Sequence, residues 1–430
     1  MQHPEYIPYR PKTRRWGLII LIAILAAGLL GLVLLQVPRV NRAVSWRMDI
    51  ALTYMRMLFN PVSKLPPPAV SVQPSVEVVT PIPQNPTETP PPTATPRYTP
   101  TPTMVPTPIP ARVQLAPPAY DEKRDKQDWN NCGPATLALY LRFFGWEGNQ
   151  FDISEVIKPT RDDRNVNVEE LVYYVRTRSG WLNAEFRVGG DLETLKKLIA
   201  AGIPVMIEET FKTDRQYWPE DDRWAGHYLL ITGYDDGEQM FTVHDTERGP
   251  NQKLTYSELD ENWQSFNRVY IMSFPPEMQG TVGSILGEDW DIDVNRQKAL
   301  EAAERETLSD PDNTFAWFNL GTNYTYFERY NEAVQAYDTA WTLGWPQRML
   351  RYQFGPFMAY FHSLRNEDLM ALTKNALEIT RTSEEAMLWR GWGFYREGSP
   401  EDALNLYRAS LKIRPDYQDA LYAIDFVTNN

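Results

Sequence analysis

The sequence contains a single cysteine, Cys132, in a stretch whose residue types suit nucleophilic chemistry. Apolar residues at three- and four-residue spacing follow it, which predicts a helix over 134–144. Pro134 suits the first turn of that helix, where a missing N–H has no cost. A thiol at a helix N-terminus faces unpaired N–H groups and the positive end of the helix dipole, and both favour the thiolate. The alternative is a small buried core thiol, which is the commoner fate of a lone cysteine.

A thiol nucleophile needs a general base within hydrogen-bond reach, a group that orients the base, and donors for the developing oxyanion. Of the four histidines, His3 precedes an apolar run and His362 lies in a helical repeat region. His227 stands at the start of an apolar strand beside Gly226, where a general base would be accessible. We predict that His227 is the base; the alternative is a core histidine with satisfied hydrogen bonds.

The orienting group is sought on the next strand, where His244 is followed directly by Asp245. Adjacent residues of a strand face opposite sides of the sheet, so these two side chains cannot both face one cleft. We predict that Asp245 orients His227 and that His244, on the other side, has a structural role.

Three blocks of sequence, in this order, resemble the bacteriocin-processing cysteine peptidase family of the papain-like clan. They are Gln127 with Asn-Cys-Gly-Pro-Ala at 131–135, Gly-His-Tyr-Leu-Leu-Ile-Thr-Gly-Tyr-Asp-Asp at 226–236, and His-Asp at 244–245. The blocks are more similar to the stand-alone branch of that family, found outside transporters. The resemblance covers about 150 residues.

The resemblance implies a role for each matching residue. Cys132 would be the nucleophile, His227 the general base and acid, and Asp245 the residue that fixes the imidazole tautomer. Gln127 matches the oxyanion-hole glutamine of the family, whose amide would act with the Cys132 backbone N–H. One departure is Thr246, because the family aspartate is usually followed by proline.

The substrate cannot be carried over from the family. Its transporter-linked members carry six membrane spans and an ATPase, and this sequence shows neither a six-span pattern nor an ATPase motif. Cleavage of double-glycine leader peptides is therefore not expected.

Composition excludes several other classes of function. A net charge of −13 leaves no broad basic excess with which to neutralise phosphates, so a nucleic-acid partner is not expected. One cysteine excludes an intramolecular disulfide framework. The acidic pairs at 162–163, 221–222 and 235–236 lack metal-site spacing, and neither a zinc motif nor a phosphate-binding glycine loop is found. We predict no cofactor and no metal.

The N-terminal region predicts attachment to a membrane. A polar tail, 1–15, precedes an uncharged run at 16–35, within a span that we place at 16–37. Twenty residues of helix measure roughly 30 Å, the thickness of the hydrocarbon core. Basic residues are denser before the run than after it, which predicts a cytoplasmic tail and extracytoplasmic domains in a single-pass protein of the cell membrane.

Two segments without a core of their own follow the predicted span. Residues 38–60 form a juxtamembrane segment with a weak amphipathic pattern. Residues 61–118 hold 19 of the 35 prolines, many of them alternating with threonine. This composition predicts a disordered, extended linker.

Residues 119–275 are predicted to form the peptidase domain, with a helical lobe before a mainly antiparallel sheet. The predicted helices are 134–144, 167–178, 191–201 and 255–263, and the predicted strands are 183–188, 203–209, 227–234, 240–245 and 268–274. This order indicates an α+β fold, here of the papain-like cysteine peptidase class.

Residues 290–430 predict an all-α domain of about three tetratricopeptide repeats. Residues 317–346 fit the 34-residue pattern, and a second copy follows at an offset of 70 residues. Gly355 and Met358 fall where a degenerate middle repeat would place its small residue and its aromatic. A helix at 293–307 is expected in front of them.

Two main functions compete. The first is a membrane-anchored cysteine peptidase whose repeats recruit a protein partner or substrate. The second is an inactive or peptide-recognising surface scaffold whose repeats mediate protein–protein interaction. A third is transferase or amidase chemistry of the same thiol, for example on cell-wall peptide. The loop 211–225, with Tyr217, Trp218 and Trp224, either walls the cleft or packs over the sheet edge.

Overall fold

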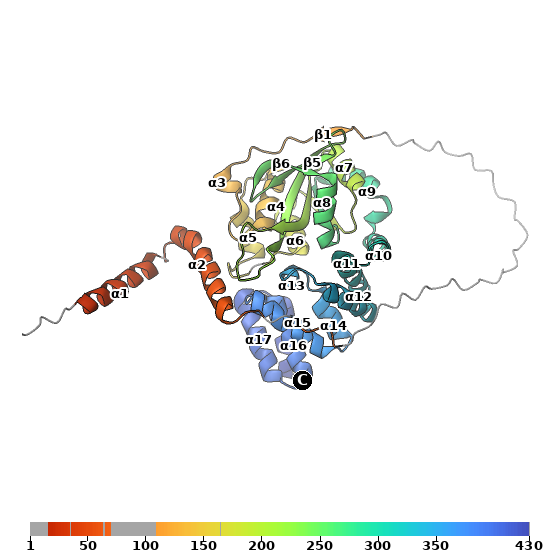
Figure 1. Cartoon of the computed structure of the whole chain (residues 1–430). Coiled ribbons are helices and arrows are strands. Elements are labelled where there is room, and N and C mark those ends of the chain that lie inside the picture. Colours follow the sequence, from red (N-terminus) through yellow and green to blue (C-terminus); the bar gives the residue numbers. More distant parts are fainter. Residues whose placement is uncertain (1–15, 35, 63–64, 70–108, 164, 430) are drawn as a thin grey trace, which may run out of the picture. The chain divides into compact units, whose positions relative to one another are not determined.

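The computed structural model describes the chain except for residues 1–15, 35, 63–64, 70–108, 164 and 430 (Figure 1). Its described residues form two compact units. The first unit is Met1–Pro61 with Arg215–Asp221, and the second is Val62–Asp214 with Asp222–Asn430. The predicted tail 1–15 and most of the predicted linker 61–118 lie outside the described residues.

The first unit contains two helices, α1 (Trp16–Leu34) and α2 (Pro38–Phe59). The span predicted for 16–37 is not one continuous helix, because 36–37 form a turn and Pro38 starts α2. Among the residues described, no helix combines the length and the apolar character needed to cross a membrane. In the same unit, the Arg215 guanidinium lies 5.5 Å from the centre of the Trp46 ring.

The second unit begins with a mixed helix–sheet domain. Its helices are α3 (Glu122–Asp125), α4 (Cys132–Phe143), α5 (Gln150–Ile157), α6 (Val168–Arg178), α7 (Leu192–Ala200), α8 (Tyr256–Trp263) and α9 (Gln279–Leu286). Its strands are β1 (Arg112–Gln114), β2 (Asn183–Arg187), β3 (Val205–Lys212), β4 (Trp224–Asp235), β5 (Met240–Asp245), β6 (Gly249–Thr255) and β7 (Tyr270–Phe274). Short 3₁₀ turns are η1 (Gln264–Phe266), η2 (Pro276–Met278) and η3 (Gly287–Trp290).

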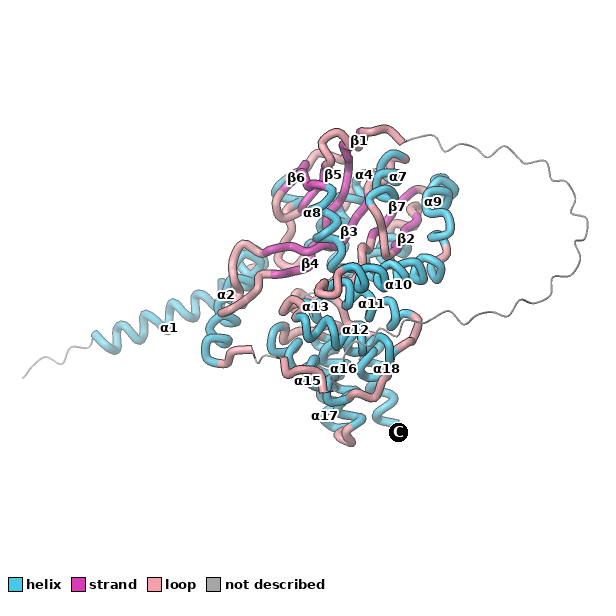
Figure 2. Tube along the Cα trace, turned by 45° about the vertical axis from the view of Figure 1, so that its right-hand side comes forward, coloured by secondary structure: helices cyan, strands magenta, loops and turns pink. Residues whose placement is uncertain are grey.

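Within the described residues, all seven strands join one antiparallel sheet of order β2-β7-β3-β4-β5-β6, with β1 paired to β4. Alternate residues of the central strands face opposite layers of helices. Leu230 packs with Leu137 of α4 and Leu171 of α6 on one side. Leu229 packs with Leu198 of α7, and with residues of α8 and α9, on the other (Figures 1 and 2). The papain-like α+β class predicted from the sequence is supported.

Some elements differ from those predicted. Strand β1 falls inside the predicted linker 61–118, because Val113 pairs with Tyr234 and packs against the core behind the sheet. Helix α5 was not predicted; the Asn149 side chain caps it, in a capping box with Asp152. Strand β6 was also not predicted, since its Gly-Pro-Asn-Gln-Lys sequence reads as a turn although it forms an edge strand.

The rest of the second unit is helical and resembles tetratricopeptide repeats, as the sequence predicts. Its helices are α10 (Ile292–Ser309), α11 (Thr314–Tyr326), α12 (Tyr330–Leu343), α13 (Met349–Tyr352), α14 (Gly355–His362), α15 (Asn366–Ile379), α16 (Glu384–Arg396), α17 (Pro400–Ile413) and α18 (Gln418–Asn429). Successive helices pack against each other, and α12 packs directly against α14 although α13 lies between them in sequence.

The repeats and the mixed domain share one apolar core. A single cluster of buried side chains includes Leu137 and Leu230 of the mixed domain together with Phe318, Tyr337 and Phe357 of the repeats. The burial of apolar surface is the dominant favourable term in such packing. The two regions therefore do not have separate cores on this side of the sheet.

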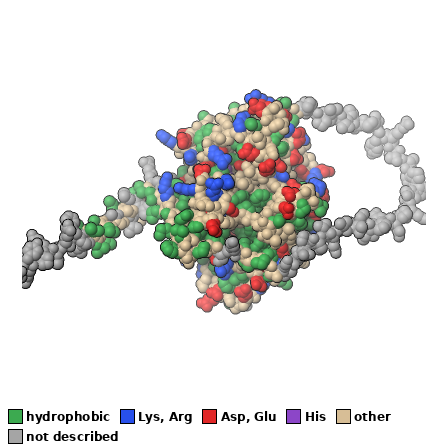
Figure 3. All heavy atoms as spheres, in the orientation of Figure 1, with side chains coloured by type: hydrophobic (Ala, Val, Ile, Leu, Met, Phe, Trp, Pro, Cys, Tyr) green, Lys and Arg blue, Asp and Glu red, His purple; other side chains and the backbone are tan. Residues whose placement is uncertain are grey.

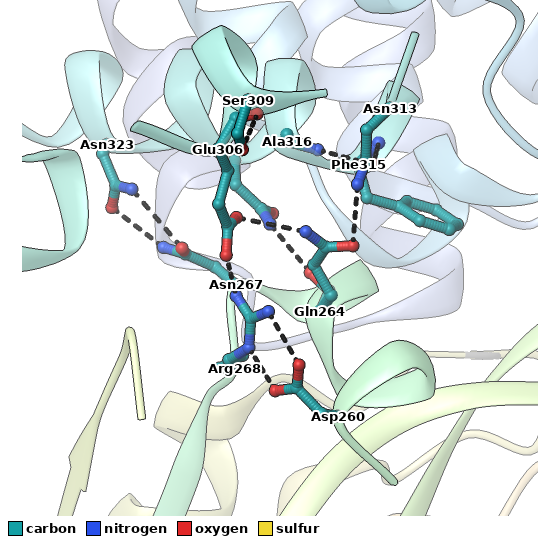
Figure 4. A network of polar contacts seen from close by, with 11 residues as sticks. Asp260, Gln264, Asn267, Arg268, Glu306, Ser309, Asn313, Phe315, Ala316 and Asn323 are labelled. Carbon is teal, nitrogen blue, oxygen red and sulfur yellow. Dashed lines mark hydrogen bonds and ion pairs between the residues drawn. The ribbon is translucent and has the colours of Figure 1, made fainter. Parts of the chain in front are cut away.

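A polar network joins the two regions at a second place (Figure 4). Arg268 forms ion pairs with Asp260, at 2.7 Å, and with Glu306 of α10, at 2.6 Å. The amides of Asn267 and Asn323 of α11 are hydrogen-bonded to each other. The two asparagines are buried and the ion pairs are partly exposed, and together these contacts fix the register of the repeats on the sheet.

The surface carries charges of both signs. On the face seen in Figure 3, basic and acidic side chains are distributed over the folded part, with apolar side chains between them.

The repeat packing depends on close approach at Gly321 of α11, where a methyl group would lie 2.7 Å from the Cδ1 atom of Tyr337. Because Tyr337 is fully buried, we expect Gly321→Ala to lower the free energy of unfolding by about 1–3 kcal/mol. Gly280→Ala in α9 is the matched control, because nothing lies within 4 Å of its new methyl group. Chemical denaturation measures both variants, and equal stabilities would contradict the packing.

Candidate active site

Cys132 is the first residue of α4 and is half-buried. Two contacts tie this end of the helix to β4. The Tyr228 ring lies 3.4 Å from the position of a Cβ on Gly133, and the Thr136 hydroxyl donates to the Tyr228 carbonyl at 3.1 Å. The thiol is thereby held beside the strand that carries His227.

His227 contacts both Cys132 and Asp245. The imidazole and the Cys132 thiol are hydrogen-bonded. The Nε2 atom of His227 lies 2.9 Å from Oδ1 of Asp245. Because imidazole has two nitrogens, Nδ1 is the one left for the thiol. The structure thus brings three of the four predicted site residues into one chain of hydrogen bonds.

Asp245 is held in place by the turn that follows β5. Its Oδ1 atom accepts from the backbone N–H groups of Glu247, at 2.7 Å, and Arg248, at 3.1 Å, in addition to His227. In the β4–β5 ladder Asp245 pairs with Leu229, whereas His244 pairs with Leu230 on the opposite side. The Nε2 atom of His244 is buried and has no hydrogen-bond partner among the described residues.

The electrostatics favour a thiolate–imidazolium pair. Burial would raise the pKa of the Cys132 thiol, but several effects outweigh it: the hydrogen bond and charge of His227, the Tyr228 backbone N–H and the charge of Lys158. The pKa of Cys132 therefore lies below its ordinary value. Burial would lower the pKa of His227, yet Asp245 and Cys132 raise it to about 10. Between these two pKa values the charged pair persists.

Two carboxyl groups lie beside His227, and their environments separate their pKa values. Glu209 pairs with His227 across the β3–β4 ladder, and burial raises the pKa of Glu209 to about 8 despite the charge of His227. Burial also opposes ionisation of Asp245, but His227 and the two backbone N–H groups hold its pKa below the ordinary value. Asp245 is therefore the ionised partner of His227 near neutral pH.

Gln127 is oriented by Thr246, the residue that departs from the family pattern. The Thr246 hydroxyl donates to Oε1 of Gln127 at 2.8 Å, and the Gln127 backbone N–H donates to the Thr246 carbonyl at 2.9 Å. With Oε1 engaged, the Nε2 amide group of Gln127 is the donor that remains. Threonine at this position thus takes part in holding Gln127.

Sequence reasoning missed Lys158, which follows α5. Its Nζ atom donates to the carbonyl of Asn130, two residues before the nucleophile, at 2.6 Å. Burial lowers the pKa of Lys158 to about 8, although nearby carboxylates such as Asp163 raise it. No local pattern marks this lysine, because only the tertiary fold brings α5 beside the Asn130 turn.

The aromatic residues of the loop 211–225 lie in different surroundings. The Phe211 ring centre lies 4.7 Å from that of His227. Trp224 is buried and stacks on Phe266 at 5.7 Å, so it packs over the sheet edge rather than walling a cleft. Tyr217 and Trp218 belong to the first unit and are described with it.

This arrangement supplies the parts required for acyl transfer. A thiolate at the start of α4, an imidazolium that can give up a proton and an ionised carboxylate are joined by hydrogen bonds, and the Cys132 backbone N–H and the Gln127 amide are the candidate oxyanion donors. Among the residues that the structure describes, no group of three or more His, Cys, Asp or Glu side chains is arranged to hold a metal ion.

Comparison with known proteins finds a family whose model is similar to this region. Residues 107–271 match the model of the Peptidase_C39 like family. A search of curated proteins found no match.

Several solved structures are similar to parts of the chain. One is a C39-like peptidase from Bacillus anthracis, with 16% identity and a TM-score of 0.29, covering 38% of this chain and 97% of that one. Another is xylellain, a cysteine protease from Xylella fastidiosa, with 14% identity and a TM-score of 0.30, covering 41% and 90%. A third is YrrB, a tetratricopeptide-repeat protein, with 18% identity and a TM-score of 0.28, covering 34% and 73%.

The ion pair predicts how Cys132 reacts with iodoacetamide as pH varies. In the wild type, the alkylation rate should rise through an inflection below the ordinary thiol pKa of about 8.5. His227→Ala removes the hydrogen bond and the charge that lower the pKa of Cys132, while the thiol keeps its burial. The inflection should therefore move to higher pH. Each unit of that shift lowers the thiolate fraction at acidic pH about tenfold. Since the chain has one cysteine, the kinetics report on Cys132 alone.

His244→Ala is the matched control, because the His244 side chain faces the opposite side of the sheet from Asp245. Its inflection should equal that of the wild type. An unchanged inflection in His227→Ala would contradict the ion pair.

Proposed function

We propose, from the premise that residues 107–271 belong to the C39-like peptidases, that this chain is a cysteine peptidase with a Cys132–His227–Asp245 triad. The observation that carries the proposal is the chain of hydrogen bonds from the thiol through His227 to Asp245, at the first residue of α4. The lowered pKa of the thiol and the raised pKa of the imidazole support the same assignment.

In the first half of the reaction, the Cys132 thiolate attacks a peptide carbonyl carbon. The carbonyl oxygen becomes an oxyanion, which accepts from the Cys132 backbone N–H and the Nε2 group of Gln127. The first N–H groups of a helix have no carbonyl partner within it, so that of Cys132 is suited to this role. One such donor contributes about 10²–10³-fold to the rate.

The first half ends when His227 donates its proton to the leaving amine, which departs and leaves an acyl group on the Cys132 sulfur. In the second half, His227, now neutral, removes a proton from water, and the resulting nucleophile attacks the thioester carbonyl. The carboxylic acid product leaves, and the thiolate–imidazolium pair is restored. Asp245 keeps the imidazole oriented and stabilises its charged form throughout.

We propose that the repeats recruit the protein substrate or a partner. Their helices α14, α16 and α18 form an aromatic groove of about 630 Å³. Its lining includes Phe361, Trp389, Trp392, Tyr395, Tyr422 and Phe426. An aromatic groove suits an extended apolar peptide, because it buries apolar side chains without requiring a charge partner.

We also propose a cellular location for the protein, from the sequence alone. The apolar run at 16–35 and the basic residues before it favour attachment to the cell membrane, with the peptidase and repeat regions extracytoplasmic. Protease added to intact cells should then degrade both regions, whereas protection of both would contradict this placement.

The peptidase assignment predicts new protein N-termini in cells that carry the wild type, absent from cells that carry Cys132→Ala. Comparison of N-terminal peptides by mass spectrometry would identify them.

Tyr422→Ala should reduce the same cleavages if the groove recruits substrate, and should leave alkylation of Cys132 unchanged. Tyr422 is 64% exposed, so its truncation leaves the repeat core intact.

Other outcomes would select another function. Identical N-termini in the two strains would favour the non-catalytic scaffold. Altered cell-wall peptides without new protein N-termini would favour transferase or amidase chemistry of the same thiol.

A further inference from the structure

The segment around α13 joins the repeat region to the candidate active site. Figures 1 and 2 both place α13 on the side of the repeats that faces the mixed domain. The Gln347 backbone N–H donates to Asp222 at 2.7 Å, the Arg348 guanidinium donates to the Trp224 carbonyl at 2.8 Å, and the Gln353 amide donates to the Ser265 carbonyl at 2.8 Å.

Tyr352 of α13 packs directly on the strand that carries His227. A side chain at Gly226 would lie 3.1 Å from Tyr352 and 2.6 Å from Phe266, so glycine is required for this close approach. The Tyr352 ring also contacts Trp224 edge to face, at 5.7 Å between ring centres. The backbone immediately before His227 is thus enclosed by a residue of the repeat region.

Arg351 of α13 reaches the other half of the site. Its Nη2 atom donates to Oδ1 of Asn130 at 2.8 Å. Asn130 has a φ of +55°, a left-handed conformation that asparagine tolerates better than most residues. Lys158 donates to the carbonyl of the same residue at 2.6 Å. Both the side chain and the backbone of Asn130 are therefore held by cations from other parts of the fold.

The Asn130 turn sets the direction of the Cys132 backbone N–H. Only Asn131 separates the two residues, and Asn131 is itself fixed by a hydrogen bond from its amide to Gln150 at 2.8 Å. A rotation at Asn130 would redirect the Cys132 backbone N–H, the proposed oxyanion donor. Small misplacements of reacting groups can reduce rates about 10²-fold.

We propose that Arg351 is a positioning residue, through which the repeat region holds the Asn130 turn and completes the catalytic site in the same chain. This inference rests on the proposed function, since it assumes that Cys132 forms an acyl-enzyme. Arg351 acts on the geometry of the turn, whereas His227, Tyr228 and Lys158 set the charge state of the thiol.

The test is the burst of p-nitrophenolate when the full chain is mixed with acetyl-Phe-Gly p-nitrophenyl ester. Acylation of Cys132 by this activated ester passes through a tetrahedral oxyanion and does not require the natural substrate. Arg351→Met keeps the apolar stem but removes the donors, and should slow the burst about 10–100-fold. The inflection of iodoacetamide alkylation should not move, and Arg351→Lys should recover part of the rate.

Two further variants separate positioning from general structure. Glu306→Gln weakens another contact between repeats and sheet, with Arg268, and should acylate as the wild type does. Asn130→Gly keeps access to the left-handed conformation but removes Oδ1, so it should lose rate as Arg351→Met does. Combining Asn130→Gly with Arg351→Met should cause little further loss, because both changes affect the rate through the same turn.

A wild-type burst rate in Arg351→Met, or additive losses in the double variant, would overturn the inference while leaving the peptidase proposal intact. No burst in the wild type, or an equal burst in Cys132→Ala, would instead overturn the proposed function. If Arg351→Met does not fold, Asn130→Gly alone decides: acylation at the wild-type rate overturns the inference.

Discussion

The site depends on one charge pair, between the half-buried Cys132 sulfur and the buried His227 imidazole. Removing either partner of such a pair leaves a charge without compensation in a medium of low polarity, so each needs its own support. The sulfur has the Tyr228 N–H and the charge of Lys158, and the imidazole has Asp245. The packing of α4 on β4 keeps the two sides together, because Thr136 and Tyr228 are hydrogen-bonded.

The second constraint is that the domain which carries the site does not pack independently of the repeats. The peptidase core is continuous with the core of the repeats, and the network around Arg268 fixes the register between them (Figure 4). Both regions belong to one compact unit, so a ligand on the repeats would bind the same body that carries the thiol. Within that unit, Arg351 of α13 donates directly to the Asn130 side chain at 2.8 Å.

The sequence was sufficient to predict those parts of the fold and site that depend on a local pattern or on the alternation of side chains along a strand. Helical spacing predicts α4 after Cys132, and the alternation of side chains separates Asp245 from His244. It was insufficient where tertiary structure decides. Lys158 and Arg351 reach Asn130 from distant elements, and Thr246, read as a departure, holds Gln127 through a contact that no spacing reveals. Strand β1 is not evident from the sequence because its residues lie in a proline-rich segment and pair with β4, which is more than 100 residues away along the chain.

The charge pair is tested most directly by the protonation state of His227. Long-range ¹H–¹⁵N spectra of histidine-labelled protein distinguish imidazolium from neutral imidazole, and His227→Ala identifies the signal among the four histidines. Since Asp245 and Cys132 raise the pKa of His227 to about 10, both of its nitrogens should remain protonated at pH 8 and change only in strongly alkaline solution. A neutral ring at pH 8, titrating near the ordinary pKa of about 6.5, would contradict the account.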